Sequence, residues 1–284
     1  MSIEITSIGS SSSGNSYIIR AGGHVILLDV GLTAKRICEA LSELDISPED
    51  VDAVLITHEH VDHVRSVRAI ARKCGSALVY ASRGTFENTE NFCHVPEERL
   101  RLVGAGEIAE IGDLQISTFP LSHDAAEPIG YAIEAGGEKL AVVTDTGIIT
   151  DEIYEAIHDA GILVFEANHD LDMLMFGGYP YRVKVRIKSD NGHLSNDYAG
   201  EVLARILEDR REQREKHPDG VFAEPLRIML AHLSFHNNMP LFARQTVEDA
   251  LTAAGFRKGS DYLIEVAARE GLTSMPLIQD SGAL

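Results

Sequence analysis

Short apolar runs separated by polar turns dominate the beginning of the chain. Residues 3–8, 16–20 and 25–29 are rich in β-branched or apolar side chains, and a Ser/Gly segment and Gly22-Gly23 separate them. This pattern is typical of short strands joined by turns. Thr33 can cap a helix that runs to about Leu44, because apolar residues then recur on one face.

The same alternation of strand and helix signals continues to the end of the chain. The middle part, residues 108–145, holds four short strands, and the remaining segments follow as single strands or helices. Strands are predicted at 51–57, 77–80, 162–165, 226–230 and 262–266, and helices at 64–73, 197–215 and 241–254. Two blocks, each of strands followed by strand–helix units, predict an α/β (α+β) fold with two sheets face to face and helices outside, an αββα sandwich. We expect a single domain over residues 1–284.

The composition excludes several classes of protein. With 25 Lys+Arg against 44 Asp+Glu, the formal net charge is −19, which argues against a domain that holds nucleic acid by bulk charge. The three cysteines share no CxxC spacing, so neither a disulfide framework nor a thiolate zinc site is indicated. No secretion signal or membrane-spanning run is visible, and we expect a soluble cytoplasmic protein.

Three histidines and an aspartate lie within six residues after the strand predicted at 51–57. His58 and His60, two apart on an extended segment, project to the same side, and Asp62 and His63 can reach a second point nearby. Imidazole and carboxylate ligands without thiolate suit Zn²⁺, Mn²⁺ or Fe. A surface histidine cluster is the alternative, but the HxHxDH spacing favours a metal site.

This HxHxDH motif resembles the signature of the metallo-β-lactamase superfamily. Further along the chain His123, Asp145 and His232 each follow a predicted strand, in the order that the resemblance requires. The resemblance implies two divalent ions, one held by His58, His60 and His123 and the other by Asp62, His63 and His232, with Asp145 bridging them. It also implies hydrolysis of a phosphoester, thioester or amide by a metal-bridging hydroxide, for which two-metal sites are suited.

Later motifs resemble one branch of this superfamily, the WalJ/YycJ-like proteins. They are the segments at 166–170 and 192–196, His-Leu-Ser at 232–234, Asn237-Asn238 and the Ser/Gly segment at 10–16. The resemblance implies a 5′-to-3′ DNA exonuclease. By similarity to the related tRNase Z enzymes, Glu166 would pair with His193, and His193 would protonate the leaving oxygen. The alternative is that Glu166 caps a helix and His193 bonds to the backbone.

A basic segment stands out in this acidic chain. Arg182, Lys184, Arg186 and Lys188 alternate with apolar residues after Pro180, which suits either an edge strand or the first turn of a helix. Functionally it is either a solvated face or a ridge that follows phosphates, with Tyr179 and Tyr181 available to stack on bases. We also expect Ser13, Asn15, Asn168 and Ser195 to contact the substrate, although the serine segment can equally be a plain polar turn.

Two other functions remain open from the sequence. A small-molecule hydrolase acting on a cyclic phosphodiester, thioester or lactone would need only the metals. A non-catalytic, metal-binding regulatory protein would keep the ligands without turnover. The resemblance favours DNA over RNA as the substrate, whereas the residues themselves leave open DNA against RNA, the strand polarity, the identity of the metal and the oligomeric state.

Overall fold

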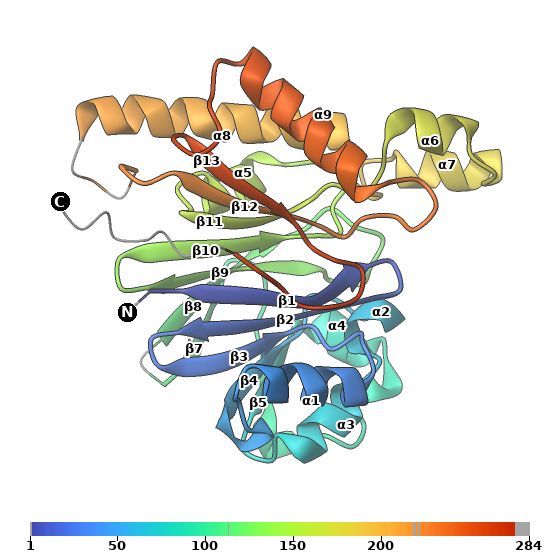
Figure 1. Ribbon diagram of the computed structural model, residues 1–284. Helices are drawn as coiled ribbons and strands as arrows, with labels where there is room; N and C mark the ends of the chain where they lie inside the picture. Colours follow the sequence, from blue (N-terminus) through green and yellow to red (C-terminus); the bar gives the residue numbers. More distant parts are fainter. Residues whose placement is uncertain (1, 113, 218–219, 221, 276–284) are drawn as a thin grey trace.

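The computed structural model in Figure 1 describes residues 2–112, 114–217, 220 and 222–275. Two seven-stranded sheets lie face to face, with helices on both outer sides, so the chain forms the four-layer αββα sandwich that the sequence predicts. In Figure 1 helices α1 and α3 cover the lower sheet, and α5, α8 and α9 cover the upper one.

Each sheet combines an antiparallel part with a parallel part. The first has the order β14-β1-β2-β3-β4-β5-β6, antiparallel from β14 to β3 and parallel from β3 to β6. The second has the order β13-β12-β11-β10-β9-β8-β7, parallel from β13 to β10 and antiparallel from there to β7. The two parts of each sheet correspond to the two parts of each sequence block. Consecutive strands joined by hairpins form the antiparallel part, and strand–helix units, which provide crossover connections, form the parallel part.

The element bounds are as follows. The strands are β1 Glu4–Ser11, β2 Gly14–Ala21, β3 His24–Leu28, β4 Val51–Leu55, β5 Leu78–Ala81, β6 Leu100–Leu102, β7 Ile108–Ile111, β8 Leu114–Pro120, β9 Ile129–Ala135, β10 Glu138–Val143, β11 Ile162–Glu166, β12 Leu226–Ala231, β13 Tyr262–Val266 and β14 Thr273–Ser274. The α-helices are α1 Ala34–Glu43, α2 Val61–Val64, α3 Val67–Lys73, α4 Arg83–Glu87, α5 Asp151–Ile157, α6 Leu171–Phe176, α7 Tyr181–Ile187, α8 Asn196–Lys216 and α9 Pro240–Ala253. Three 3₁₀ helices, at Pro48–Asp50, Glu90–Phe92 and Glu97–Arg99, complete the set.

The two sheets share one apolar core. It contains Ile5, Tyr17 and Leu55 from the first sheet, packed with Tyr131 and Val164 from the second. β11 and β12 are buried at every position, which explains why their sequences read as continuous apolar runs rather than as alternating ones. Both sheets therefore contribute to the same buried cluster between them.

Several local predictions need correction. The helix predicted at 64–73 is two helices, α2 and α3, because the Ser66 amide donates to the carbonyl oxygen of Val30 instead of continuing a helical ladder. The Ser/Gly loop at 10–16 is mostly strand, since β1 and β2 form a hairpin that leaves only residues 12–13 as a turn. The basic segment forms α7, and the strand alternative is wrong: Pro180 is the N-cap of that helix.

The sequence patterns did not reveal all elements. The patterns miss five short elements, which are helices α4, α5 and α6 and strands β6 and β14. Each is too short for its apolar residues to show a helical or strand period. Among the described residues, no helix combines the length and the apolar character that crossing a bilayer requires.

Candidate metal centre

Four strands end at the same edge of the sandwich, and the predicted metal ligands follow them. β4 leads into the segment with His58 and His60, β8 into His123, β10 into Asp145, and β12 into His232. Within each sheet these strands run in parallel, so their carboxyl ends lie together and loops gather there. The four segments, distant in sequence, therefore converge.

The predicted ligands form two groups with a compact arrangement in each. Ligand atoms of His58, His60 and His123 lie within 4.8 Å of one another, and the same holds for Asp62, His63 and His232. Both sets that the resemblance implies are among the clusters of ligand atoms in the structure, and His58, His63 and Asp145 form a further cluster across the two sets. Imidazole nitrogens and carboxylate oxygens without thiolate are the donors that Zn²⁺, Mn²⁺ and Fe prefer.

Asp145 lies between the two groups. Its Oδ1 is 3.7 Å from Nε2 of His123, in the first group, and 3.2 Å from Nε2 of His232, in the second. Its Oδ2 is 3.3 Å from Nε2 of His63. One carboxylate thus lies within 4 Å of imidazoles of both groups.

The backbone is strained where the centre is built. Within the described chain, four residues other than glycine have a positive φ, and three of them are Asp29 (53°), Asp145 (60°) and His232 (54°). Such conformations cost free energy and persist only where surrounding contacts enforce them, and they cluster at functional sites. Here the three residues are ones whose side chains contact the candidate ligands or belong to them.

Asp29, which lies outside every motif of the sequence, orients His63. Its Oδ2 lies 2.7 Å from Nδ1 of His63, and its Oδ1 accepts a hydrogen bond from the Thr57 amide at 2.9 Å. A carboxylate accepts from the imidazole N–H at Nδ1, which leaves Nε2 to face a metal, as is common for histidine ligands. The available signal was an aspartate at the end of β3, the strand beside β4.

Asn15 contacts two of the candidate ligands. Its Nδ2 lies 3.2 Å from Nε2 of His63, and its Oδ1 lies 3.3 Å from Nδ1 of His232. The side chain is fully buried between β1 and these histidines. Asn15, which we expected at the substrate, therefore has the contacts of a residue that holds the ligands in place.

The unpaired atoms of the centre fit metal ions. Nε2 of His58 and Oδ2 of Asp145 are buried, and neither has a hydrogen-bond partner among the described residues. Burial and then the neighbouring imidazoles hold the pKa of His58 and of His232 well below the usual range. Imidazoles that stay neutral at pH 7 keep a lone pair for a cation, and a cation supplies the partner that these buried atoms lack.

His63 differs from the other imidazoles. Burial alone would lower its pKa, but the carboxylates of Asp29 and Asp145 raise the pKa of His63 to about 10. The carboxylates around His63 therefore carry negative charge that the neighbouring neutral imidazoles do not compensate. A divalent cation held by the same carboxylates would provide that balance in place of a proton.

Glu166 and His193 form a buried pair beside the bridging carboxylate. Oε1 of Glu166 lies 2.8 Å from Nδ1 of His193, and Oε2 accepts hydrogen bonds from the amides of Thr146 and Leu194 at 3.0 and 3.3 Å. Burial opposes protonation of His193, yet Glu166 and then Asp145 outweigh it and raise the pKa of His193 above its ordinary value. The helix-cap alternative for Glu166 is not what the structure shows, because its carboxylate binds the His193 ring.

The cations of α7 are not all free. Nζ of Lys184 donates to the carbonyl oxygens of Met175 and Gly177 at 2.7 and 2.8 Å, at the end of α6. Nε of Arg186 lies 2.6 Å from Oδ2 of Asp124, the neighbour of His123. Arg182 is exposed. The segment therefore combines cations used by the fold with cations that face solvent.

The other residues expected at the substrate take three different positions. Ser13 is exposed in the turn between β1 and β2. Asn168 is buried and donates from Nδ2 to the carbonyl oxygen of His232 at 2.8 Å, which supports that ligand's backbone. Ser195 is the N-cap of α8 and accepts a hydrogen bond from the Tyr198 amide at 3.2 Å.

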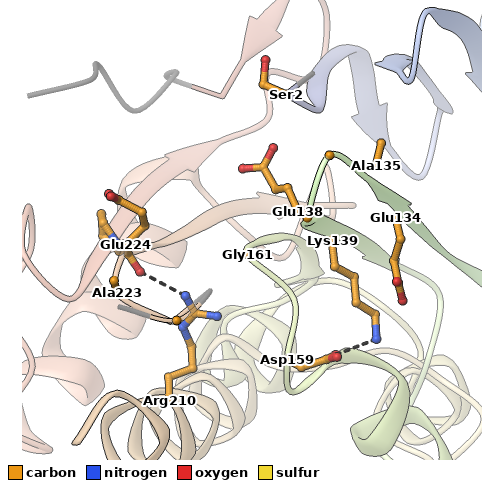
Figure 2. A pocket seen from close by; sticks show the side chains of 14 residues that line it. Ser2, Glu134, Ala135, Glu138, Lys139, Asp159, Gly161, Arg210, Ala223 and Glu224 are labelled. Atoms are coloured by element: carbon orange, nitrogen blue, oxygen red, sulfur yellow. Dashed lines mark hydrogen bonds and ion pairs between the residues drawn. The ribbon is translucent and has the colours of Figure 1, made fainter. Parts of the chain in front are cut away.

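A large cavity lies away from this centre. Figure 2 shows it between the β9–β10 hairpin and the end of α8, with a volume of about 800 Å³. Lys139 and Gly161 line it at the amino ends of β10 and β11, opposite the carboxyl ends that carry the candidate ligands. Lys139 pairs there with Asp159 at 2.6 Å. The cavity contains none of the candidate ligands, so its size does not mark the functional site.

Known proteins resemble this chain over almost its whole length. A family model described as a β-lactamase superfamily domain matches residues 24–211. The exodeoxyribonuclease YycJ of Bacillus anthracis is 34% identical over 265 residues, which cover 93% of this chain and 95% of the relative. The exodeoxyribonuclease WalJ of Streptococcus pneumoniae is 35% identical over 260 residues, covering 90% and 91%.

A solved structure supports the same fold. The metallo-β-lactamase fold protein YhfI from Bacillus subtilis superposes with a TM-score of 0.66 over 96% of this chain and 99% of its own, at 15% sequence identity. At that identity the likeness concerns the arrangement of the two sheets and their helices.

Proposed function

The chain belongs to the β-lactamase superfamily, in the family of the exodeoxyribonucleases YycJ and WalJ, and from this premise we propose that it is a metal-dependent exonuclease that degrades DNA. The observation that carries the proposal is the Glu166–His193 pair beside Asp145, the carboxylate shared by the two ligand groups. A metal centre alone would suit many hydrolases of this fold. A proton donor next to it suits the poor alkoxide leaving group of a phosphodiester.

We assign the residues that hold the two ions as follows. His58, His60 and His123 would hold one ion, Asp62, His63 and His232 would hold the other, and Asp145 would be shared by both. When bound, two divalent ions supply a water of lowered pKa as the nucleophile and neutralise the charge that builds on the phosphate oxygens. The donor set is compatible with Zn²⁺ or Mn²⁺, and also with Fe.

His193 is assigned as the proton donor to the leaving oxygen. Glu166 holds Nδ1 through a 2.8 Å hydrogen bond, so that Nε2 is the atom free to deliver a proton. The Glu166 carboxylate raises the pKa of His193 and so favours the protonated imidazole. Asp145 Oδ1, 3.9 Å from Nδ1, adds to this effect.

The substrate contacts are proposed from the surface around the centre. Arg182, exposed on α7, and Ser13, exposed in the β1–β2 turn, are free to reach phosphate oxygens. Arg186 would attract the phosphates electrostatically while it stays paired with Asp124. Lys184 would have to leave its two carbonyl partners to contact a phosphate. The degradation is proposed to run 5′-to-3′ in the cytoplasm.

One experiment separates this function from its rivals. The purified protein is incubated with Mn²⁺ or Zn²⁺ and with single- and double-stranded DNA and RNA labelled at either end, with bis-p-nitrophenyl phosphate alongside. We expect mononucleotides to be released from DNA, and the position of the label reports the polarity. Hydrolysis of the small ester alone would favour a small-molecule hydrolase, and no hydrolysis at all would favour a non-catalytic metal-binding protein.

The role of His193 has its own test. Replacing it by alanine (His193→Ala) is expected to lower the turnover of DNA by about 10²–10⁴-fold, the usual contribution of a general acid. The metal content, measured by elemental analysis, should not change, because His193 is outside the six histidine and aspartate ligands and the bridge. A fully active variant would overturn the assignment.

A further inference from the structure

Bulky apolar side chains are exposed in two neighbouring segments beside the metal centre. Of the eleven large hydrophobic residues that are exposed in the described chain, eight lie in residues 175–185 and 235–242. Phe176 is 87% exposed, Tyr181 75% and Phe235 59%. Apolar surface concentrated in this way marks a place where something binds.

The two segments form one continuous surface. The rings of Tyr179 and His236 have centroids 5.8 Å apart, and the Asp170 amide donates to the carbonyl oxygen of Asn237 at 2.9 Å. Figure 1 shows α6 and α7 standing together at the end of the sandwich, next to the loop that enters α9. We call this surface the aromatic shelf, made of Phe176, Tyr179, Tyr181, Phe235 and His236.

The shelf connects directly to the candidate centre. At the far end of α7 the His193 amide donates to the carbonyl oxygen of Ile187 at 2.8 Å. On the same helix Arg186 pairs with Asp124, whose Oδ1 is 3.4 Å from Nε2 of the candidate ligand His123. A ligand lying along the shelf would therefore run from solvent to the metal ligands.

A small pocket opens in the shelf. Its volume is about 290 Å³, near the lower end of the pockets that hold small ligands. Met175, Tyr181 and Val185 provide apolar walls, and the side chains of Lys184 and Lys188 border it. Apolar walls with cations at the rim suit a flat ring attached to a phosphate.

The charge of the shelf favours a polyanion over a protein. Residues 179–188 contain four cations and no acid, whereas the whole chain has a net charge of −19. Arg182 and Lys188 are exposed beside the aromatic rings. Exposed aromatic rings interleaved with cations are the features by which proteins hold single-stranded nucleic acid, because unpaired bases stack on the rings while cations follow the phosphates.

We propose that the aromatic shelf binds the unpaired strand of a DNA substrate and leads its end to the metal centre, with one base in the pocket between α6 and α7. The proposal rests on the proposed function and deepens it: the form that enters the centre is single-stranded. A duplex keeps its bases stacked inside and offers no free ring face to Phe176 or Tyr181. A second copy of the chain is the main alternative occupant.

The test measures binding without cleavage. The double variant Phe176→Ala/Tyr181→Ala is compared with the unmodified protein by fluorescence anisotropy in EDTA, using a labelled single-stranded DNA and a blunt hairpin duplex of the same charge. We expect the affinity for the single strand to fall about tenfold or more for each ring removed, while the affinity for the hairpin changes little. The conservative variant Phe176→Tyr/Tyr181→Phe should restore single-strand binding, because it keeps both ring faces.

A matched control separates the shelf from apolar surface in general. Leu102→Ala/Ile108→Ala removes two exposed apolar side chains on β6 and β7, which are edge strands of the two sheets and carry no residue of the shelf. This variant should leave single-strand binding unchanged. Thermal melting of each variant verifies that it folds.

Three results would overturn the proposal. They are undiminished single-strand binding by Phe176→Ala/Tyr181→Ala, no single-strand binding by the unmodified protein, and equal losses for single strand and hairpin. Loss of a dimer in sedimentation, with DNA binding intact, would assign the shelf to contacts between copies. Because cleavage is not measured, the shelf can succeed even if the exonuclease activity fails, and the reverse also holds.

Discussion

At the scale of single residues, the centre depends on side chains that fix which imidazole nitrogen faces a metal. The Gly192 carbonyl oxygen lies 3.1 Å from Nδ1 of His123 and can only accept, so Nδ1 carries the proton and Nε2 is free. The Asp29 carboxylate does the same for His63. These partners are outside the ligand set, yet they determine its geometry.

The Asp29 contact gives a prediction about metal affinity. In Asp29→Asn a single oxygen remains to accept from both the Thr57 amide and Nδ1–H of His63, so one of these hydrogen bonds is lost, and we expect the affinity for Zn²⁺ to fall about 10–100-fold. Competition with a chromogenic chelator measures this. Asp45→Asn is the matched control, since Asp45 also has a positive φ (55°) but is exposed far from the ligands. Equal affinities in both variants would contradict the role of Asp29.

The Glu166–His193 pair gives a prediction about pH. The pKa of His193 is raised, so the imidazole stays protonated at pH values above the ordinary pKa of histidine. Activity that needs this proton is lost as the pH rises through the raised pKa. In Glu166→Gln the raising carboxylate is gone while burial still lowers the pKa. We expect the alkaline limb of the kcat profile to move to lower pH. Exposed Glu152→Gln should leave the profile in place, and an unmoved limb in Glu166→Gln would exclude the coupling.

At the scale of elements, the layers depend on close approach as well as on apolar faces. α8 and α9 cover the second sheet and cross where α8 carries Gly200. A Cβ built on Gly200 would lie 2.8 Å from Cβ of Ala250, closer than real side chains come. The two helices can therefore pack at this distance only because one of them has no side chain there.

This close approach predicts a stability effect. Gly200→Ala is expected to destabilise the protein by about 1–3 kcal/mol, because overpacking must push the helices apart. The midpoint of urea denaturation measures it. Gly75→Ala is the control: a Cβ at Gly75 meets no atom within 4 Å, so that variant should be as stable as the unmodified protein. A Gly200→Ala variant of unchanged stability would show that α8 and α9 adjust without cost.

At the scale of the whole molecule, the acidic charge and the metal centre belong together. The net charge of −19 includes Asp62 and Asp145, which lie among the candidate ligands. Two divalent ions would add four positive charges at the point that a phosphate must approach. The charge of the whole chain thus argues for weak non-specific binding to DNA, while the centre and the shelf remain locally attractive to it.

Metal removal should therefore destabilise the whole fold. The centre joins both sheets, with His58 and His63 from the first and Asp145 and His232 from the second. A ligand at about 1,000 times its Kd stabilises the folded state by about 4 kcal/mol. We expect chelation to lower Tm by about 10 °C, and addition of Zn²⁺ or Mn²⁺ to restore it. A Tm insensitive to chelator and metal would contradict a metal centre in these residues.

Much of the fold and of the candidate site follows from the sequence alone. Buried strands are visible as apolar runs, and HxHxDH is visible because all its members lie within six residues. The sandwich and the strand-end positions of His123, Asp145 and His232 also follow, since a strand's end is a local signal. What these patterns share is that the interacting residues are near one another in the chain.

Only the tertiary structure decided which distant residues meet. Asp29 follows β3 and supports His63, and Asn15 in β2 contacts both His63 and His232. From its sequence the basic segment could form either a strand or a helix. In the structure it is a helix, and it contacts Asp124 through Arg186 and the end of α6 through Lys184. No local pattern carries this information, because the free energy gained from burial and from long-range hydrogen bonds depends on residues that are distant in the sequence and become neighbours only in the folded chain.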